Sequence, residues 1–162
     1  MTIDATYGSA AFRPAAAQRE WTAVQALVIF LVFFLVSIIP LLTHLLPPPE
    51  DWANHVSRMQ VTIDHGRNPN PAKYYEIDWE PLPNLMMDLI VPFIGRFVNV
   101  YLASQIFMIS VFALIMSGTF ALKRALFKRW SLLPLAVFPL LYNHMFLAGV
   151  MNYLFGNGLS PW

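Results

Sequence analysis

Three polar residues, Asp51, His55 and Arg58, follow directly after an apolar stretch and are spaced by four and then three positions. This spacing places side chains on one face of a helix, so a carboxylate, an imidazole and a guanidinium are predicted to form one row. The carboxylate can act as a general base or coordinate a divalent cation, and the other two groups can hold a lipid-linked phosphate. On spacing alone we favour the simpler interpretation, which is the water-facing side of a surface helix.

Four further polar residues interrupt apolar stretches: His44, Asn143, His144 and Asn152. Polar side chains inside a bilayer are costly unless they face protein, water or a cofactor. His144 can ligate the metal of a haem or a chlorophyll, but no second ligand stands at a suitable spacing, and Asn143 can equally form a hydrogen bond between helices. We therefore predict no cofactor.

Asp88 and Arg96, which flank Pro92, form a third candidate site, but a spacing of eight residues is about two helical turns and argues against a direct ion pair. The absence of cysteine excludes disulfides and thiolate metal sites. No P-loop, Rossmann, HExxH or GxSxG motif occurs, and the basic cluster at 123–129 is too short to predict nucleic-acid binding.

The composition predicts an all-α integral membrane protein. Only 12% of the 162 residues are charged, about half the share in soluble domains, and 57% are hydrophobic. Uncharged stretches predict three transmembrane helices, which we place at 23–46, 100–122 and 131–155. Three consecutive prolines from Pro47 end the first span, because proline cannot continue a helix.

The segment 47–99 between the first two spans is predicted to lie on the membrane surface. A helix over about 50–65 carries an apolar stripe of Trp52, Val56, Met59 and Ile63, which we expect to face the lipid interface while Glu50 and Asp51 cap its start. A short apolar stretch at 85–94, with Asn84 as its cap, predicts a re-entrant or interfacial helix.

The distribution of basic residues predicts the orientation of the chain. Four bases fall in the loop 123–130, and the tail 1–22 carries two arginines, so both are expected in the cytoplasm. The segments 47–99 and 156–162 are then external, and the expected location is the inner membrane of a bacterium, either cytoplasmic or intracytoplasmic.

A strip of small residues runs along the second predicted span at helical spacing: Ser110, Ala113, Ser117 and Ala121. Small side chains let the backbones of two membrane helices approach closely. The strip therefore predicts a helix-packing face, either for the protein's own helices or for those of another subunit.

The segment PPPEDWANHVSRM, followed by a helix that ends at Gly66, resembles the opening of bacterial polytopic membrane proteins related to the GT-C glycosyltransferase superfamily. The resemblance covers about residues 23–66. It implies that Asp51 is the catalytic base or a metal ligand, that His55 and Arg58 support it, and that the sugar donor is a polyprenyl phosphate lipid. Members of the superfamily have many more spans, so the resemblance also fits a shortened remnant with lost activity or a new role.

Two functions follow from these observations. The first, which we favour, is a non-catalytic accessory subunit that packs against the transmembrane helices of a larger complex, such as a photosynthetic or respiratory one. Its partners are the lipid bilayer and the helices of other subunits. The alternative is a GT-C-type transferase, or a truncated remnant of one, which acts on lipid-linked sugar and uses Asp51, His55 and Arg58 with a divalent cation.

Overall fold

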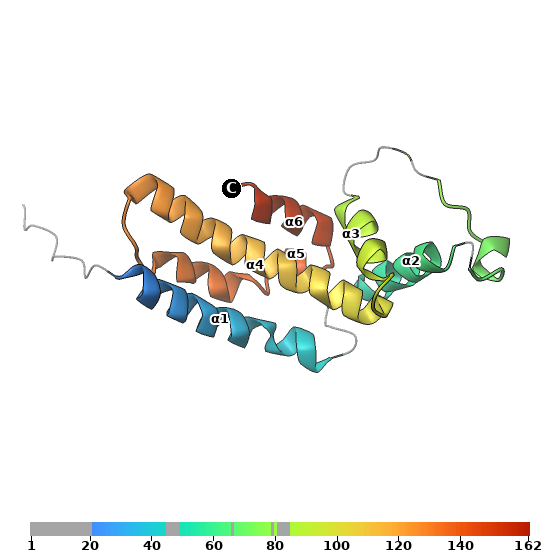
Figure 1. Ribbon diagram of the computed structural model, residues 1–162, viewed down its shortest axis with the longest axis horizontal. Helices are drawn as coiled ribbons and strands as arrows, with labels where there is room; N and C mark the ends of the chain where they lie inside the picture. The colour runs from blue at the N-terminus through green and yellow to red at the C-terminus, as the bar shows by residue number, and fades with distance from the viewer. Residues whose placement is uncertain (1–20, 45–48, 66, 79, 81–84) are drawn as a thin grey trace, which may run out of the picture.

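A computed structural model describes residues 21–44, 49–65, 67–78, 80 and 85–162. Within these residues every regular element is a helix. The longest, α4 (Val100–Phe127), runs through the molecule and packs against α1, α2, α3, η2 and α6 (Figure 1). Its buried side chains, among them Phe107, Phe112 and Met116, form the centre of the hydrophobic core.

Two helices, α1 (Ala23–Thr43) and α4, are long and apolar enough to cross a membrane by length and composition. Local capping sets where each begins. The Thr22 hydroxyl accepts from the backbone N–H of Gln25, whose side chain accepts in return from the Thr22 backbone N–H. The Asn99 side chain accepts from Leu102 N–H at the start of α4. The α4 helix continues beyond its predicted end at 122 and includes the first residues of the basic loop.

The prediction of one continuous helix over 131–155 is wrong. The structure has instead a 3₁₀ helix, η2 (Leu133–Leu140), and two α-helices, α5 (His144–Leu147) and α6 (Met151–Leu159). Pro134 and Pro139 cannot donate the hydrogen bonds of an α-helix, and Gly149 has a φ of +86°, which favours glycine. The prediction rested on the length of the uncharged run and gave too little weight to the two prolines and the glycine within it.

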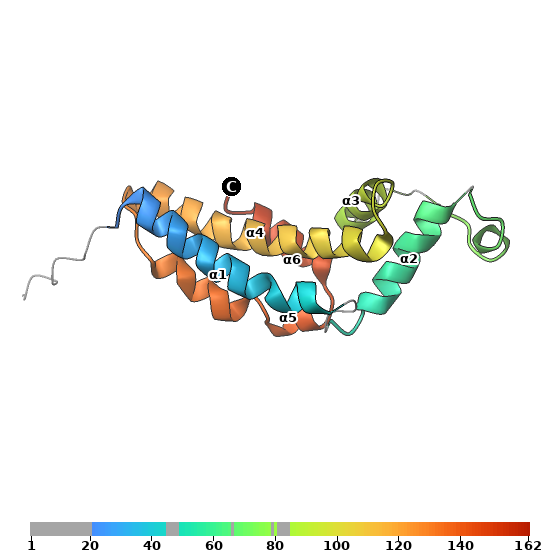
Figure 2. The ribbon, with the colours of Figure 1, turned by 60° about the horizontal axis from the view of Figure 1, so that its bottom comes forward.

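The segment from η2 to α5 lies along α1 (Figure 2). The ring of Phe138 meets that of Phe33 edge-on at 5.0 Å, and the Tyr142 hydroxyl donates to the Ser37 carbonyl oxygen at 2.6 Å. Pro40 has no N–H to donate to the carbonyl oxygen four residues earlier, at Val36, and the Tyr142 hydrogen bond falls on the neighbouring carbonyl, that of Ser37.

After Gly149 the chain reverses, and α6 returns alongside α4. Trp162 lines the same apolar groove as Ala23 and Arg124, which belong to the start of α1 and the last turns of α4. The predicted external location of 156–162, on the same side as the segment 47–99, stays a prediction.

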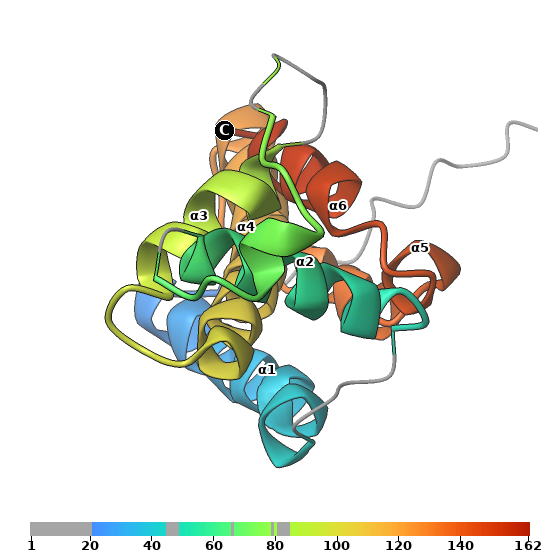
Figure 3. The same cartoon turned by 90° about the vertical axis from the view of Figure 1, so that its right-hand side faces the viewer.

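At the other end of the bundle lie α2 (Trp52–Asp64) and α3 (Met86–Ile94), and the short 3₁₀ helix η1 (Pro71–Lys73) follows α2 (Figure 3). The predicted amphipathic helix is confirmed, but Trp52, Val56 and Met59 are buried in the protein core. The expectation that this stripe faces lipid is wrong for these three residues, because α3 and α4 cover them. Ile63 is half-buried and packs beside the same core.

The start of α3 differs from the predicted capping. Leu85 occupies the N-cap position and makes no side-chain cap hydrogen bond, while Asn84 lies outside the described residues. The Asn152 side chain of α6 supplies the missing acceptor, since its Oδ1 receives the Met87 backbone N–H at 2.7 Å. A residue 65 positions away thus caps this short helix.

The four residues of the predicted packing strip, Ser110, Ala113, Ser117 and Ala121, are all half-buried. The hydroxyls of Ser110 and Ser117 donate to carbonyl oxygens one turn earlier in α4. A tight approach occurs elsewhere, where Gly118 of α4 faces Gly158 and Pro161. Sequence inspection missed this contact because the two glycines are far apart in the chain.

Candidate functional site

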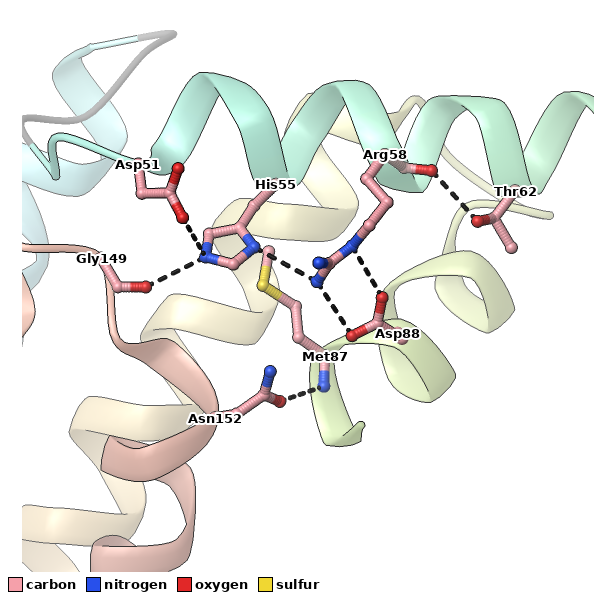
Figure 4. Close-up of polar contacts among 8 residues, drawn as sticks. All are labelled: Asp51, His55, Arg58, Thr62, Met87, Asp88, Gly149 and Asn152. Carbon is pink, nitrogen blue, oxygen red and sulfur yellow. Dashed lines mark hydrogen bonds and ion pairs between the residues drawn. The ribbon is translucent and has the colours of Figure 1, made fainter. Parts of the chain in front are cut away.

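The predicted row of Asp51, His55 and Arg58 lies on α2 and at its N-cap (Figure 4). Asp51 occupies the N-cap position, but its side chain does not cap the helix. Its Oδ1 accepts from Asn54 Nδ2 at 2.7 Å, and its Oδ2 lies 3.4 Å from His55 Nε2. The Asp51 side chain is 49% exposed, so the carboxylate remains accessible from solvent.

His55 links α2 to the turn before α6. Its Nε2 lies 3.1 Å from the Gly149 carbonyl oxygen, and its Nδ1 lies 3.4 Å from Arg58 Nη2. Because a guanidinium only donates, Nδ1 must accept, and the hydrogen-bond network assigns the proton of a neutral ring to Nε2. Nε2 then donates to the Gly149 carbonyl oxygen, which fixes the reversal of the chain against α2.

Arg58 forms a bidentate ion pair with Asp88 of α3. Arg58 Nε lies 2.9 Å from Asp88 Oδ1, and Nη2 lies 3.0 Å from Oδ2. The Asp88 side chain is 16% exposed, and the Arg58 side chain is 53% exposed. Water can therefore solvate the charge of Arg58 better than that of Asp88, so the carboxylate needs the ion pair more than the guanidinium does. Asp88 thus pairs with Arg58 and not with Arg96, whose guanidinium lies 5.8 Å from the centre of the Phe93 ring.

The five groups just described, Asp51, His55, Arg58, Asp88 and the Gly149 carbonyl, are called the polar clasp below. They come from three separate parts of the chain and hold α2, α3 and the turn at Gly149 together. The spacing of Asp88 and Arg96 predicted no direct ion pair between them, and Asp88 instead pairs with Arg58, which lies 30 residues away in the chain. No local signal in the sequence could reveal that pairing.

The remaining predicted polar residues serve local structure. The Asn143 side chain accepts from the Phe146 backbone N–H and caps α5. His44 closes α1, with its Nδ1 3.2 Å from the Pro40 carbonyl oxygen, while Gln105 Nε2 donates to the His44 carbonyl oxygen. His144 is exposed, and within the described residues no three His, Asp or Glu side chains gather as metal ligands would.

A hollow of about 510 Å³ adjoins the polar clasp, between α2 and the residues around 75–80. Arg58 and Asp88 form part of its wall and neutralise each other. Three further carboxylates line it, from Glu76, Asp78 and Glu80. The charge in this acidic hollow is therefore negative, which disfavours a phosphate.

No family model, curated protein or solved structure matches this chain. The resemblance to GT-C proteins stays a prediction carried by the residues around Asp51.

Proposed function

We propose that this chain is a non-catalytic subunit that lies in the inner membrane of a bacterium and packs against the transmembrane helices of a larger complex. The outer face of α1 carries this proposal. Large apolar side chains between 45% and 70% exposed cover it from end to end: Val24, Leu27, Val28, Leu31, Val32, Leu35, Val36, Ile39 and Leu42. Water cannot stably cover so large an apolar surface, whereas lipid or other helices can.

The polar clasp supports a structural role. Arg58 is neutralised by Asp88, and His55 donates to a backbone carbonyl, so both side chains are engaged in holding helices together. Arg58 is therefore not free to bind the phosphate of a lipid-linked donor beside Asp51. The pairing of Arg58 therefore favours the structural role.

Site-directed photo-crosslinking tests the subunit proposal. We expect a photoreactive side chain at Leu35 in α1 to form adducts with one protein, which also co-purifies at a fixed ratio after mild detergent extraction. Tyr75 is the matched control, because it is 59% exposed against 58% for Leu35 but lies outside the apolar face. Adducts with lipid alone from Leu35, together with no co-purifying protein, would contradict the proposal.

The proposed orientation places the loop 123–130 in the cytoplasm, because of Lys123, Arg124, Lys128 and Arg129. The chain has no cysteine, so single cysteines can report each side without further changes. We expect an impermeant thiol reagent added outside intact spheroplasts to label Asn70→Cys and to spare Leu126→Cys. The reverse pattern would show that the orientation is wrong.

A GT-C-type transferase remains the second candidate, and the accessible Asp51 carboxylate beside His55 favours it. Asp51→Asn keeps the shape of the side chain and removes its charge. If the chain is a subunit, we expect partner recovery to be unchanged in this variant. If it is a transferase, sugar transfer from a polyprenyl phosphate donor by the purified protein should fall by orders of magnitude. Transfer by the wild-type protein that Asp51→Asn abolishes would overturn the subunit proposal.

A further inference from the structure

A second hollow, of about 570 Å³, lies between the end of α2 and α3. It shares Asp88 with the acidic hollow, but its wall carries arginines where the acidic hollow carries carboxylates. Its lining includes His65, Arg67, Asp88, Leu89, Phe93 and Arg96. We call it the cationic hollow, because its arginines come from two separate segments and meet around one space.

The charges of the cationic hollow favour an anion. Asp88 is the carboxylate in its wall, and the bidentate pair with Arg58 already compensates that charge. Arg67 and Arg96 are exposed and form no ion pair with another described residue. His65 adds a further hydrogen-bonding group. The carboxylates of the acidic hollow, on the other side of Asp88, repel an anion, so an anion is favoured in the cationic hollow and disfavoured in its neighbour.

Apolar side chains adjoin these cations. Leu89 and Phe93 line the cationic hollow and are 52% and 59% exposed, and Phe97 beyond them is 77% exposed. The Phe93 ring also supports the Arg96 guanidinium. A ligand that uses both parts of this surface must carry an anionic group next to an apolar chain.

We propose that the cationic hollow binds the headgroup of an anionic phospholipid. Arg67 and Arg96 hold its phosphate through charge-assisted hydrogen bonds, and its acyl chains follow Leu89 and Phe93 along the outside of α3. The position agrees with this ligand, because α3 lies beside the start of α4, where a membrane-crossing helix meets the headgroup region. This inference rests on the proposed membrane location and does not depend on any protein partner.

Native mass spectrometry of the purified chain in detergent tests the site. We expect phosphatidylglycerol to bind more tightly than phosphatidylcholine with the same acyl chains. Arg67→Gln and Arg96→Gln should each weaken phosphatidylglycerol binding about tenfold, since each removes one charged hydrogen-bonding group. Lys73→Gln is the matched control, because Lys73 is an exposed cation that does not line the cationic hollow, and it should leave binding unchanged.

Two further arms separate a lipid from a free phosphate. Inorganic phosphate should compete only weakly with phosphatidylglycerol, and Leu89→Asn should weaken lipid binding without affecting phosphate. The lipid assignment would be overturned if inorganic phosphate competed strongly and the Leu89→Asn variant still bound phosphatidylglycerol with full affinity. Unchanged binding in both arginine variants, or equal loss in Lys73→Gln, would overturn the site.

Arg96→Lys should retain part of the affinity, and circular dichroism checks that each variant is folded. Because the assay uses the chain alone, failure to find a partner protein leaves its outcome unaffected.

Discussion

Replacement of Gly158 by leucine is expected to lower the midpoint of thermal unfolding of the purified protein by about 5 to 10 °C. A Cβ atom built at Gly158 lies 2.8 Å from Leu114 Cβ and 3.2 Å from the backbone nitrogen of Ile115. The second of these atoms belongs to the α4 backbone and cannot move aside alone. A larger side chain must therefore push α6 away from α4, at a cost of about 2 to 3 kcal/mol.

Gly156 provides a matched control on the same helix, because a Cβ atom there meets nothing within 4 Å. We expect Gly156→Ala to keep the midpoint or to raise it slightly, since alanine favours a helix over glycine by about 1 kcal/mol. Gly158→Ala should lower the midpoint in the same measurement. Equal behaviour of the two alanine variants would contradict the close packing of α6 on α4.

Replacement of Trp52 by alanine is expected to destabilise the protein by about 3 to 5 kcal/mol, which corresponds to a fall of about 10 °C or more in the unfolding midpoint. Trp52 is 1% exposed and belongs to the core with Val56 and Met59. Its removal leaves a cavity between α2 and its neighbours. If the side chain instead faced the lipid interface, the loss would be small.

Two variants identify the cause of this loss. Tyr75→Ala removes an aromatic ring that is 59% exposed, and it should change the midpoint little. Trp52→Phe keeps most of the apolar volume and removes an indole N–H that has no hydrogen-bond partner among the described residues. It should therefore recover much of the stability lost in the alanine variant. A fall in Tyr75→Ala equal to that in Trp52→Ala would contradict burial of the tryptophan.

The sequence alone determined the elements that depend on neighbouring residues. The long apolar runs predicted α1 and α4. The structure adds the caps at their starts, Thr22 and Asn99, which also act within one helical turn. The stripe that begins at Trp52 predicted an amphipathic helix, and α2 agrees with it to within two residues at its start. These features follow from hydrogen bonds and side-chain periodicity within a few turns, which a local pattern records.

What covers each helix was decided by tertiary structure. An apolar stripe has the same pattern whether lipid or protein lies against it, so the sequence did not reveal that α3 and α4 cover α2. The break in the helix predicted at 131–155 had a local cause in Pro134 and Pro139. The direction of α6 depends instead on the turn at Gly149, which lies against Asp51 and accepts a hydrogen bond from His55 of α2. An apolar run specifies burial and does not specify a straight helix.

The candidate site shows the same division. Helical spacing correctly placed Asp51, His55 and Arg58 along one helix, but their roles depend on groups distant in the chain. Arg58 pairs with Asp88 across 30 residues, and His55 reaches the Gly149 carbonyl across 94. Such contacts form only when the helices pack, because packing brings groups from distant parts of the chain within hydrogen-bond distance of one another.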